Sequence, residues 1–438
     1  MVYRCARRVS LSVLAAALLL LSSWGAVARA QQADDSKHEP ITTELITLVD
    51  HDAGLKAMLV ESIAKAKTQN DDRKTNPAQN LEEYYRFIDW AAKALPWTIL
   101  AEPPPRSKLF EQIDQSLDYF YFVNDQPLEE LKGKGYYNAS IQYVEPYRTW
   151  LIQFTKSWGV FLSMYASWSD AYYKKALEDD RFGLQNGWYE DSSHWKTFND
   201  FFARYLKSPD QRPIADPGDP SEVASPADSE PQGVWRIDKD SNIVGDPGAK
   251  PEPKPGVLIK SNNFKSIPAL IGPGSAYQKA FANGTLTHTF LNVNDYHRYH
   301  FPMGGVVKEV RIIAADDAAG GITTWNRSTG KYELESREPG WQSIETRGCV
   351  VIETKEYGLV ALLPIGMSQV SSVNFETAVK VGNAFKKGDM LGWFLFGGSD
   401  FVILYQDKVK FSLTVPKEGP GYKHVLMGER LGKVEPKK

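Results

Sequence analysis

Cysteine is almost absent from this sequence, which contains two cysteines in 438 residues. Cys5 lies in the apolar N-terminal segment, so Cys349 has no partner with which to form an internal disulfide. No cluster of cysteines and histidines has the spacing of metal ligands, and no bound metal is predicted. Because Val350, Val351 and Ile352 follow Cys349, we expect a buried structural thiol.

An excess of positive charge is also missing. The formal net charge is −3, and residues 1–30 contribute four arginines and no acidic residue, so the rest of the chain is more acidic than the total. This balance argues against a broadly basic surface and predicts no nucleic-acid partner, although it leaves a local basic patch open. A hydrophobic fraction of 42% and an aromatic fraction of 12% are sufficient for a large packed core in two or three domains.

Long apolar runs are confined to the N-terminus. Three arginines precede an apolar run at residues 11–27, and Ala28-Arg29-Ala30 supplies the small residues that a signal peptidase requires. We therefore expect a signal peptide at residues 1–30, a mature chain starting at Gln31, and export to the periplasm or the exterior. The alternative is an uncleaved membrane anchor, because the run approaches the length of a membrane span.

Residues 31–42 are polar, whereas several stretches from residue 43 onward have apolar or aromatic residues three or four positions apart, which is typical of helices. Helices are expected at residues 43–67, 81–95 and 150–176, and residues 109–123 are expected to be helical or extended. An aromatic stripe in the last helix consists of Trp150, Phe154, Trp158, Phe161, Tyr165 and Trp168. Such a stripe predicts a packed core or, alternatively, the wall of an apolar substrate cleft.

The pattern changes near residue 256 to short strands rich in Val and Ile, after a stretch at 207–256 with the composition of loops. Strands are expected at residues 306–313, 349–354, 359–364, 371–374 and 401–405, and the Lys-Gly-Asp sequence at 387–389 predicts a hairpin. Helices and strands that are segregated along the chain predict an α+β fold. The predicted division is a signal peptide at 1–30, a helical, aromatic-rich domain at 31–195 and a β-rich domain at 196–438.

Two glycines and a serine interrupt an apolar, strand-like run at residues 393–405. Glycine inside a strand costs stability and marks a bulge or a close approach of backbone. The run by itself therefore favours a bulge or a tight bend. The other interpretation is a site where the peptide bond between Gly398 and Ser399 takes part in chemistry.

Candidate catalytic groups are present in the same half of the chain. Serine becomes a nucleophile when a base takes its proton and a carboxylate orients that base. The chain offers Ser399, His297 or His300, and Asp228. The two histidines would point to opposite faces of an extended segment and could converge in a turn. Spacing alone makes this a weak triad.

These pieces together resemble the phosphatidylserine decarboxylases, which are self-cleaving enzymes that depend on a pyruvoyl group. The resemblance covers roughly residues 195–438, and the helical region ahead of it looks like the extra N-terminal domain of one branch. That branch includes enzymes acting on soluble aromatic amino acids. The matching motifs are Phe198-Asn-Asp-Phe-Phe-Ala-Arg204, Arg212-Pro-Ile214, Ser225-Pro-Ala-Asp228, Asp295-Tyr-His-Arg-Tyr-His-Phe-Pro302, Lys387-Gly-Asp-Met-Leu-Gly392 and Phe396-Gly-Gly-Ser399.

The resemblance implies a mechanism and a role for each candidate. His300, oriented by Asp228, would deprotonate Ser399, whose oxygen would attack the carbonyl carbon of Gly398. β-Elimination would then separate a large chain ending at Gly398 from a small chain that begins with a pyruvoyl group made from Ser399. The pyruvoyl carbonyl would form a Schiff base with the substrate amine, and His297 would help to protonate the product. The large and small chains would stay associated.

Three positions depart from the family pattern. Asp400 stands where the family usually has threonine after the modified serine, and its carboxylate could slow processing or contact a substrate ammonium group. Ser229 stands where a glycine often follows the triad aspartate. Glu345-Thr346-Arg347 lacks the asparagine of a common motif. These departures leave all members of the implied triad in place.

The leading hypothesis is a carboxy-lyase that converts phosphatidylserine to phosphatidylethanolamine and carbon dioxide, with peripheral membrane contact as an option. The first alternative is decarboxylation of a soluble amino acid, with aromatic amino acids as one option, by the same mechanism. Export and an acidic mature chain would suit this alternative. A second is a non-catalytic binding module on the same scaffold. A third is a serine hydrolase, which the lack of a Gly-x-Ser-x-Gly elbow makes the weakest option.

Overall fold

The computed structural model describes residues 38–100, 108–245, 262–315, 321–366, 372–397 and 399–437. The predicted signal peptide and Gly398 lie outside these ranges. Residues 41–438 belong to one compact unit, whereas the predicted boundary near residue 195 stays a prediction. Within the described ranges, none of the helices has both the length and the apolar character that a membrane span needs.

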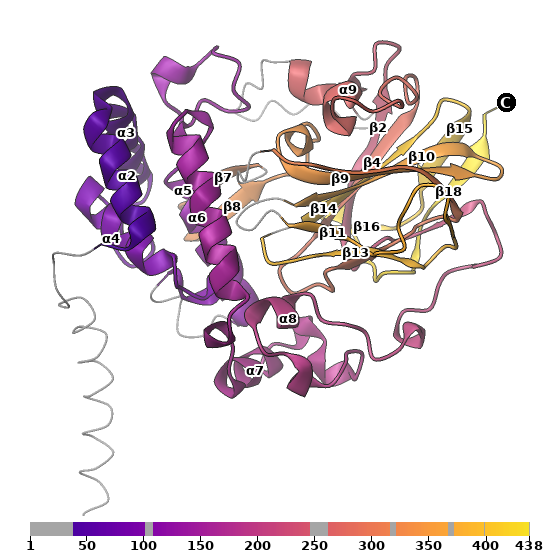
Figure 1. Ribbon diagram of the computed structural model, residues 1–438, viewed down its shortest axis with the longest axis horizontal. Coiled ribbons are helices and arrows are strands. Elements are labelled where there is room, and N and C mark those ends of the chain that lie inside the picture. The colour runs from indigo at the N-terminus through magenta and orange to yellow at the C-terminus, as the bar shows by residue number, and fades with distance from the viewer. Residues whose placement is uncertain are drawn as a thin grey trace, which may run out of the picture. The chain divides into compact units, whose positions relative to one another are not determined.

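Helices dominate the N-terminal part of the unit, as predicted (Figure 1). The expected helix at 43–67 is two helices, because Asp52 accepts a hydrogen bond from Leu55 N and caps the second one. The expected long helix at 150–176 is also divided, by a 3-10 turn at Tyr165–Ser167. The helices are α2 (Pro40–His51), α3 (Ala53–Gln69), α4 (Leu81–Ala91), α5 (Leu109–Phe122), α6 (Tyr147–Leu162), α7 (Asp170–Leu177), α8 (Phe198–Phe202) and α9 (Ile267–Ile271).

The aromatic stripe on α6 forms core, in agreement with the first of its two interpretations. Trp150, Phe154 and Trp158 are buried to within 1% of complete burial. Phe154 stacks on Phe120 of α5, with ring centroids 5.1 Å apart. Tyr165 departs from the stripe, because it lies beyond the end of α6 and is 77% exposed.

An eight-stranded antiparallel sheet is the centre of the C-terminal part, in the order β12-β6-β9-β10-β14-β4-β2-β3. The predicted α+β class is therefore confirmed. The strands β2 and β3 fall in the stretch that was expected to be loop. The bounds are β2 (Glu230–Ile237), β3 (Ile243–Val244), β4 (Thr285–Leu291), β6 (Gly305–Ile313), β9 (Thr346–Thr354), β10 (Gly358–Gly366), β12 (Ala384–Phe385) and β14 (Ser399–Tyr405).

Four smaller groups of strands accompany this sheet. One three-stranded sheet joins β1 (Glu222–Ala224), β18 (Arg430–Pro436) and β15 (Val409–Leu413), and the other joins β11 (Val373–Phe375), β13 (Met390–Phe394) and β5 (Arg298–His300). Two-stranded pairs are formed by β7 (Ile322–Asn326) with β8 (Lys331–Glu335) and by β16 (Lys417–Glu418) with β17 (Gly421–Tyr422).

The two faces of β14 contribute to different cores, because side chains alternate along a strand. Phe401 and Ile403 belong to a core shared with the helical region and the two small sheets. Val402 and Leu404 belong to a second core, which also contains residues of α9. Cys349 lies in this second core as a free, buried thiol, which confirms its predicted structural role, and burial raises its pKa to about 12.

The interrupted run at residues 393–405 is two strands from different sheets, not one strand with a bulge. β13 pairs with β11 and β5 in a small sheet, whereas β14 lies between β10 and β4 in the large sheet. Residues 395–397, which we call the crossover segment, lead from the first sheet toward the second. The expected hairpin at 387–389 is wrong for the same reason, because β12 and β13 also belong to different sheets.

Candidate active site

Ser399 is the first residue of β14, at the point where the chain enters the large sheet. Its backbone is paired with Leu291 of β4 on one side and with Gly366 of β10 on the other. The side chain is completely buried, and Oγ has no hydrogen-bond partner among the described residues. A buried hydroxyl in this condition costs about 1–3 kcal/mol, so it needs an explanation beyond folding.

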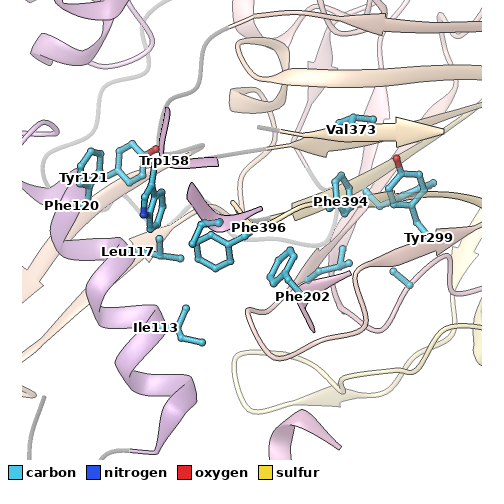
Figure 2. Packing of buried hydrophobic residues seen from close by; sticks show 14 of the residues in the cluster. Ile113, Leu117, Phe120, Tyr121, Trp158, Phe202, Tyr299, Val373, Phe394 and Phe396 are labelled. Atoms are coloured by element: carbon cyan, nitrogen blue, oxygen red, sulfur yellow. The ribbon is translucent and has the colours of Figure 1, made fainter. Parts of the chain in front are cut away.

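The crossover segment before Ser399 is held by contacts from the helical part. Phe396 N donates a hydrogen bond of 3.0 Å to Asn199 Oδ1. The Phe396 ring lies between Trp158 of α6 and Phe202 of α8, with centroid distances of 5.5 Å and 5.1 Å (Figure 2). Gly397 has a φ of 149°, which favours glycine. The segment therefore enters the site in a fixed position.

Helix α8 supplies most of these contacts. Thr197 and Asp200 form a capping box that fixes the start of this short helix. Its buried face then presents Asn199 to the crossover segment and Phe202 to His297, whose ring stacks on Phe202 at 3.7 Å. Arg204, just after the helix, donates 2.7 Å and 3.1 Å hydrogen bonds to the carbonyl oxygens of Asn294 and Asp295.

His297 is completely buried just before β5. Its Nδ1 lies 2.9 Å from the carbonyl oxygen of Asp295. A carbonyl cannot donate, so Nδ1 carries the proton and Nε2 carries the lone pair. Nε2 has no partner among the described residues. Burial, together with the positive charge of Arg204, lowers the pKa of His297 well below its usual value.

His300 is the last residue of β5, with its amide bonded to the carbonyl oxygen of Pro226 at 2.8 Å. Its Nδ1 lies 2.8 Å from the carbonyl oxygen of Gly388, so Nδ1 is again the protonated nitrogen. Nε2 faces the hydroxyl of Tyr296 at 3.3 Å. Burial lowers the pKa of His300 to about 4, which leaves the ring neutral at physiological pH.

Asp228 is not hydrogen-bonded to His300, in contrast to the orientation that the resemblance implies. Both carboxylate oxygens are taken by Arg212, through Nε at 3.0 Å and Nη2 at 2.7 Å, and the amide of Met427 donates to Oδ1 at 2.7 Å. Asp228 still acts on His300 through its charge, which raises the pKa of His300 against the larger effect of burial. The structure therefore brings Asp228 near His300 without a direct bond.

Asp400 is directed away from Ser399, because neighbouring residues on a strand face opposite sides. It is completely buried, and its oxygens lie 3.0 Å from His288 Nδ1 and 3.0 Å from Gln342 Nε2. The suggestion that Asp400 contacts a substrate ammonium group has no support in this geometry. Ser229 is buried too, and its hydroxyl accepts a 2.6 Å hydrogen bond from Thr289.

Four residues of the site belong to the family motifs, but the sequence predicts no role for them: Asn199, Phe202, Arg212 and Tyr296. Asn199 and Phe202 reach the crossover segment or His297 from α8, whereas Arg212 and Tyr296 contact Asp228 and His300. Their only sequence signal was membership of a motif. The contacts of Asn199 and Phe202 join residues about 100–200 positions apart, which local spacing cannot reveal.

Comparison with known proteins identifies the family of the chain. The family model described as phosphatidylserine decarboxylase matches residues 198–433, which is more than half of the chain and contains Asp228, His297, His300 and Ser399. The chain therefore belongs to the phosphatidylserine decarboxylase family. Helices α2 to α7 precede the matched region.

Among curated proteins, the chain is 28% identical over 250 residues to the decarboxylase iboD of Amanita muscaria, covering 55% of this chain and 66% of that protein. It is 30% identical over 248 residues to phosphatidylserine decarboxylase proenzyme 3 of Schizosaccharomyces pombe, covering 56% of this chain and 23% of that protein. It is 28% identical over 253 residues to the phosphatidylserine decarboxylase proenzyme of Alcanivorax borkumensis, covering 55% and 78%. The chain thus spans no more than about two thirds of the first two relatives.

Proposed function

We propose that this chain is a self-processing decarboxylase that acts on phosphatidylserine and depends on a pyruvoyl group made from Ser399. The observation that carries the proposal is the buried, unpartnered Oγ of Ser399 at the start of β14. A buried polar group without a hydrogen-bond partner needs an explanation, and use in chemistry is one such explanation. Membership of the phosphatidylserine decarboxylase family supports the same reading.

Self-processing converts one peptide bond in three balanced steps. Ser399 Oγ loses its proton and attacks the carbonyl carbon of Gly398, and the amide nitrogen leaves as a free amine, so the amide becomes an ester. β-Elimination removes the Cα proton of residue 399, breaks the Cβ–O bond, releases the Gly398 carboxylate and leaves a dehydroalanine at position 399. Addition of water and loss of ammonia then give the pyruvoyl group. We assign the role of base to His300, whose neutral ring has its lone pair on Nε2.

The surroundings of residue 399 suit a pyruvoyl group. The backbone there is paired on both sides within the large sheet, and the orphaned Oγ is the atom that processing removes. When present, the pyruvoyl carbonyl would condense with the substrate amine and withdraw electrons from the bond that releases carbon dioxide. We assign the later proton transfer to His297, because its Nε2 lone pair is buried and unpartnered among the described residues.

The two chains produced by processing are expected to stay associated. The small chain, residues 399–438, contains β14, which lies in the middle of the large sheet between β10 and β4. It also contains β18, which pairs with β1 of the large chain. Separation of the chains would expose the apolar residues of both cores, which opposes dissociation.

The first test is denaturing electrophoresis and mass spectrometry of the purified protein. We expect two fragments, and the C-terminal fragment should be lighter than residues 399–438 by one molecule of ammonia. Ser399→Ala and His300→Ala should remain at full length, and so should Asp228→Ala. An uncleaved wild-type chain would contradict the enzymatic proposal and favour a binding module. Covalent labelling of Ser399 by a fluorophosphonate would instead indicate a serine hydrolase.

The second test distinguishes the two substrate classes. Processed protein is incubated with vesicles containing phosphatidylserine, and separately with free serine and free aromatic amino acids, and carbon dioxide is measured. We expect release from the vesicles, with Ser399→Ala as the inactive control. Release from free amino acids alone would reject the lipid substrate. That outcome is the alternative to consider, since one of the similar proteins is called simply a decarboxylase.

We also propose export and peripheral contact with a lipid surface. Export is supported by the sequence of residues 1–30, and N-terminal sequencing of exported protein should give Gln31.

Lipid contact is assigned to the α6 tip, defined as Val160, Met164 and Tyr165, which are 57%, 50% and 77% exposed. Exposed aromatic and apolar side chains suit the interfacial region of a membrane.

A further inference from the structure

Asp400 is held in a buried polar network on the face of β14 opposite Ser399. One oxygen lies 3.0 Å from His288 Nδ1 on β4, and the other accepts from Gln342 Nε2 at 3.0 Å. Gln342 lies on a 3-10 helix, Trp341–Ser343, and its own oxygen accepts from the amide of Gly340 at 2.8 Å. Asp400 thus connects β14 to two other segments, β4 and this 3-10 helix.

The protonation of this network follows from its acceptors. His288 Nε2 lies 2.8 Å from the carbonyl oxygen of Arg337, so Nε2 carries a proton. Nδ1 faces a carboxylate oxygen, and one further proton must lie between these two atoms. The Asp400–His288 pair therefore has no net charge, which is the state that a fully buried pair requires. Trp235 stacks on His288 with centroids 4.9 Å apart and limits its movement.

Self-cleavage changes how the N-terminal end of β14 is held. In the uncleaved chain, residue 399 is connected covalently to the crossover segment, which is anchored by Asn199, Trp158 and Phe202. Cleavage at Gly398–Ser399 removes that connection and makes residue 399 a chain end. Chain ends fray unless they are tied down. The side chain of Asp400 is the first one after the new chain end that can hold this end in place.

We propose that Asp400, through His288 and Gln342, is a positioning residue that holds residue 399 in place after self-cleavage. This inference rests on the proposed function, because it requires a cleaved chain. Asp400 does not touch the reacting atoms; it fixes the strand from the opposite face. It would thereby keep the catalytic end of the small chain in register with β4 and β10.

The test measures amide hydrogen exchange of residues 400–405 in cleaved and uncleaved protein. Asp400→Ala should raise exchange by about tenfold in the cleaved form, which is the factor expected for the loss of about one hydrogen bond. The same change in the uncleaved Ser399→Ala background should have little effect, because the covalent connection persists. Gln342→Ala, which leaves β14 unaltered in sequence, should give a smaller rise that is again confined to the cleaved form.

Two further variants separate positioning from general stability. Asp400→Asn should restore slow exchange, because its amide can donate to His288 Nδ1 while its oxygen accepts from Gln342. Val402→Ala changes the next residue on the same face of β14 and should lower the melting temperature without a difference between cleaved and uncleaved forms.

Three outcomes would overturn the proposal. Equal exchange in the two backgrounds would make Asp400 an ordinary part of the core. A folded Asp400→Ala chain that stays uncleaved would place its role before processing. If Asp400→Ala does not fold, amide hydrogen exchange of Gln342→Ala and Asp400→Asn tests the proposal in its place. An uncleaved wild-type chain, visible by electrophoresis, would defeat the proposed function as well, so the two failures are distinguishable.

Discussion

Two buried atoms of the candidate site, Ser399 Oγ and His297 Nε2, have no hydrogen-bond partner among the described residues. The cost of each is of the order of a lost hydrogen bond, about 1–3 kcal/mol. Both atoms are nucleophilic or basic, and both belong to motifs that were selected from the sequence. At the scale of single residues, the site is therefore arranged for reactivity at some expense of stability.

The first prediction concerns the pH dependence of self-cleavage. A base must be neutral to accept the serine proton, and burial lowers the pKa of His300 to about 4. The rate of cleavage should thus be constant between about pH 5 and 8 and should fall as pH decreases through about 4. It is measured by electrophoresis at intervals after cell-free synthesis and transfer to each pH.

Folding at each pH is verified by circular dichroism of the uncleaved Ser399→Ala chain. A midpoint near pH 6.5, the value of an unperturbed histidine, would show that a solvated group and not the buried His300 accepts the proton.

At the scale of elements, the short helix α8 connects the parts of the site. Its residues contact the crossover segment through Asn199, His297 through Phe202, and the chain before His297 through the adjacent Arg204. One turn of helix thus contacts two of the segments that the proposed mechanism brings together.

The second prediction is that Asn199→Ala slows self-cleavage by roughly 10–100-fold. The variant removes the acceptor of the Phe396 amide, and displacement of reacting groups by about 1 Å can cost 100-fold in rate. The cleavage rate constant is measured well below the melting temperature, so that the comparison is between folded proteins.

Thr197→Ala is the matched control within the same element. It removes the capping box and should cost about 1 kcal/mol of stability, but it leaves the Asn199–Phe396 bond in place. If both variants slow cleavage equally, the effect of Asn199 is one of helix stability and not of positioning.

At the scale of the whole molecule, α6 connects the outer surface of the helical region with the reaction site. Trp158 contacts Phe396 in the crossover segment, and Val160 of the α6 tip lies two residues further along the same helix. Ser163, just after α6, accepts a hydrogen bond of 2.9 Å from Asn199. A lipid surface bound at the tip would therefore lie about one helical turn from the contacts that hold the site.

The third prediction tests this surface. Val160→Glu should reduce binding to vesicles containing phosphatidylserine by about fivefold, because a carboxylate loses apolar contact and is repelled by anionic lipid at a cost of about 1 kcal/mol. Binding is measured by co-sedimentation with vesicles of fixed composition.

Ile312→Glu on β6 provides a control of equal exposure, since Ile312 is 56% exposed and Val160 is 57% exposed. It should leave vesicle binding unchanged. An equal loss of binding in both variants would indicate a general effect of negative charge and would remove the α6 tip as the docking surface.

The local sequence pattern predicts the helices and strands better than it predicts which of them pack or pair with one another. Burial of Trp150, Phe154 and Trp158 could be predicted because helical periodicity identifies an apolar face. The strands around residues 349–364 could be predicted from their runs of Val, Ile and Leu. Breaks in long helices were missed, because Asp52 caps a helix only through a hydrogen bond that the pattern does not reveal.

The sequence by itself determined the family motifs, the α+β class and the candidate residues Asp228, His297, His300 and Ser399, because these depend on residue identity and short spacing. Only the tertiary structure decided that Trp393 and Ser399 belong to strands of two different sheets. It also decided that Asp228 pairs with Arg212 and that Asp400 faces away from Ser399. Strand pairing and buried ion pairs join residues distant in sequence, and the energy that selects them exists only in the packed molecule.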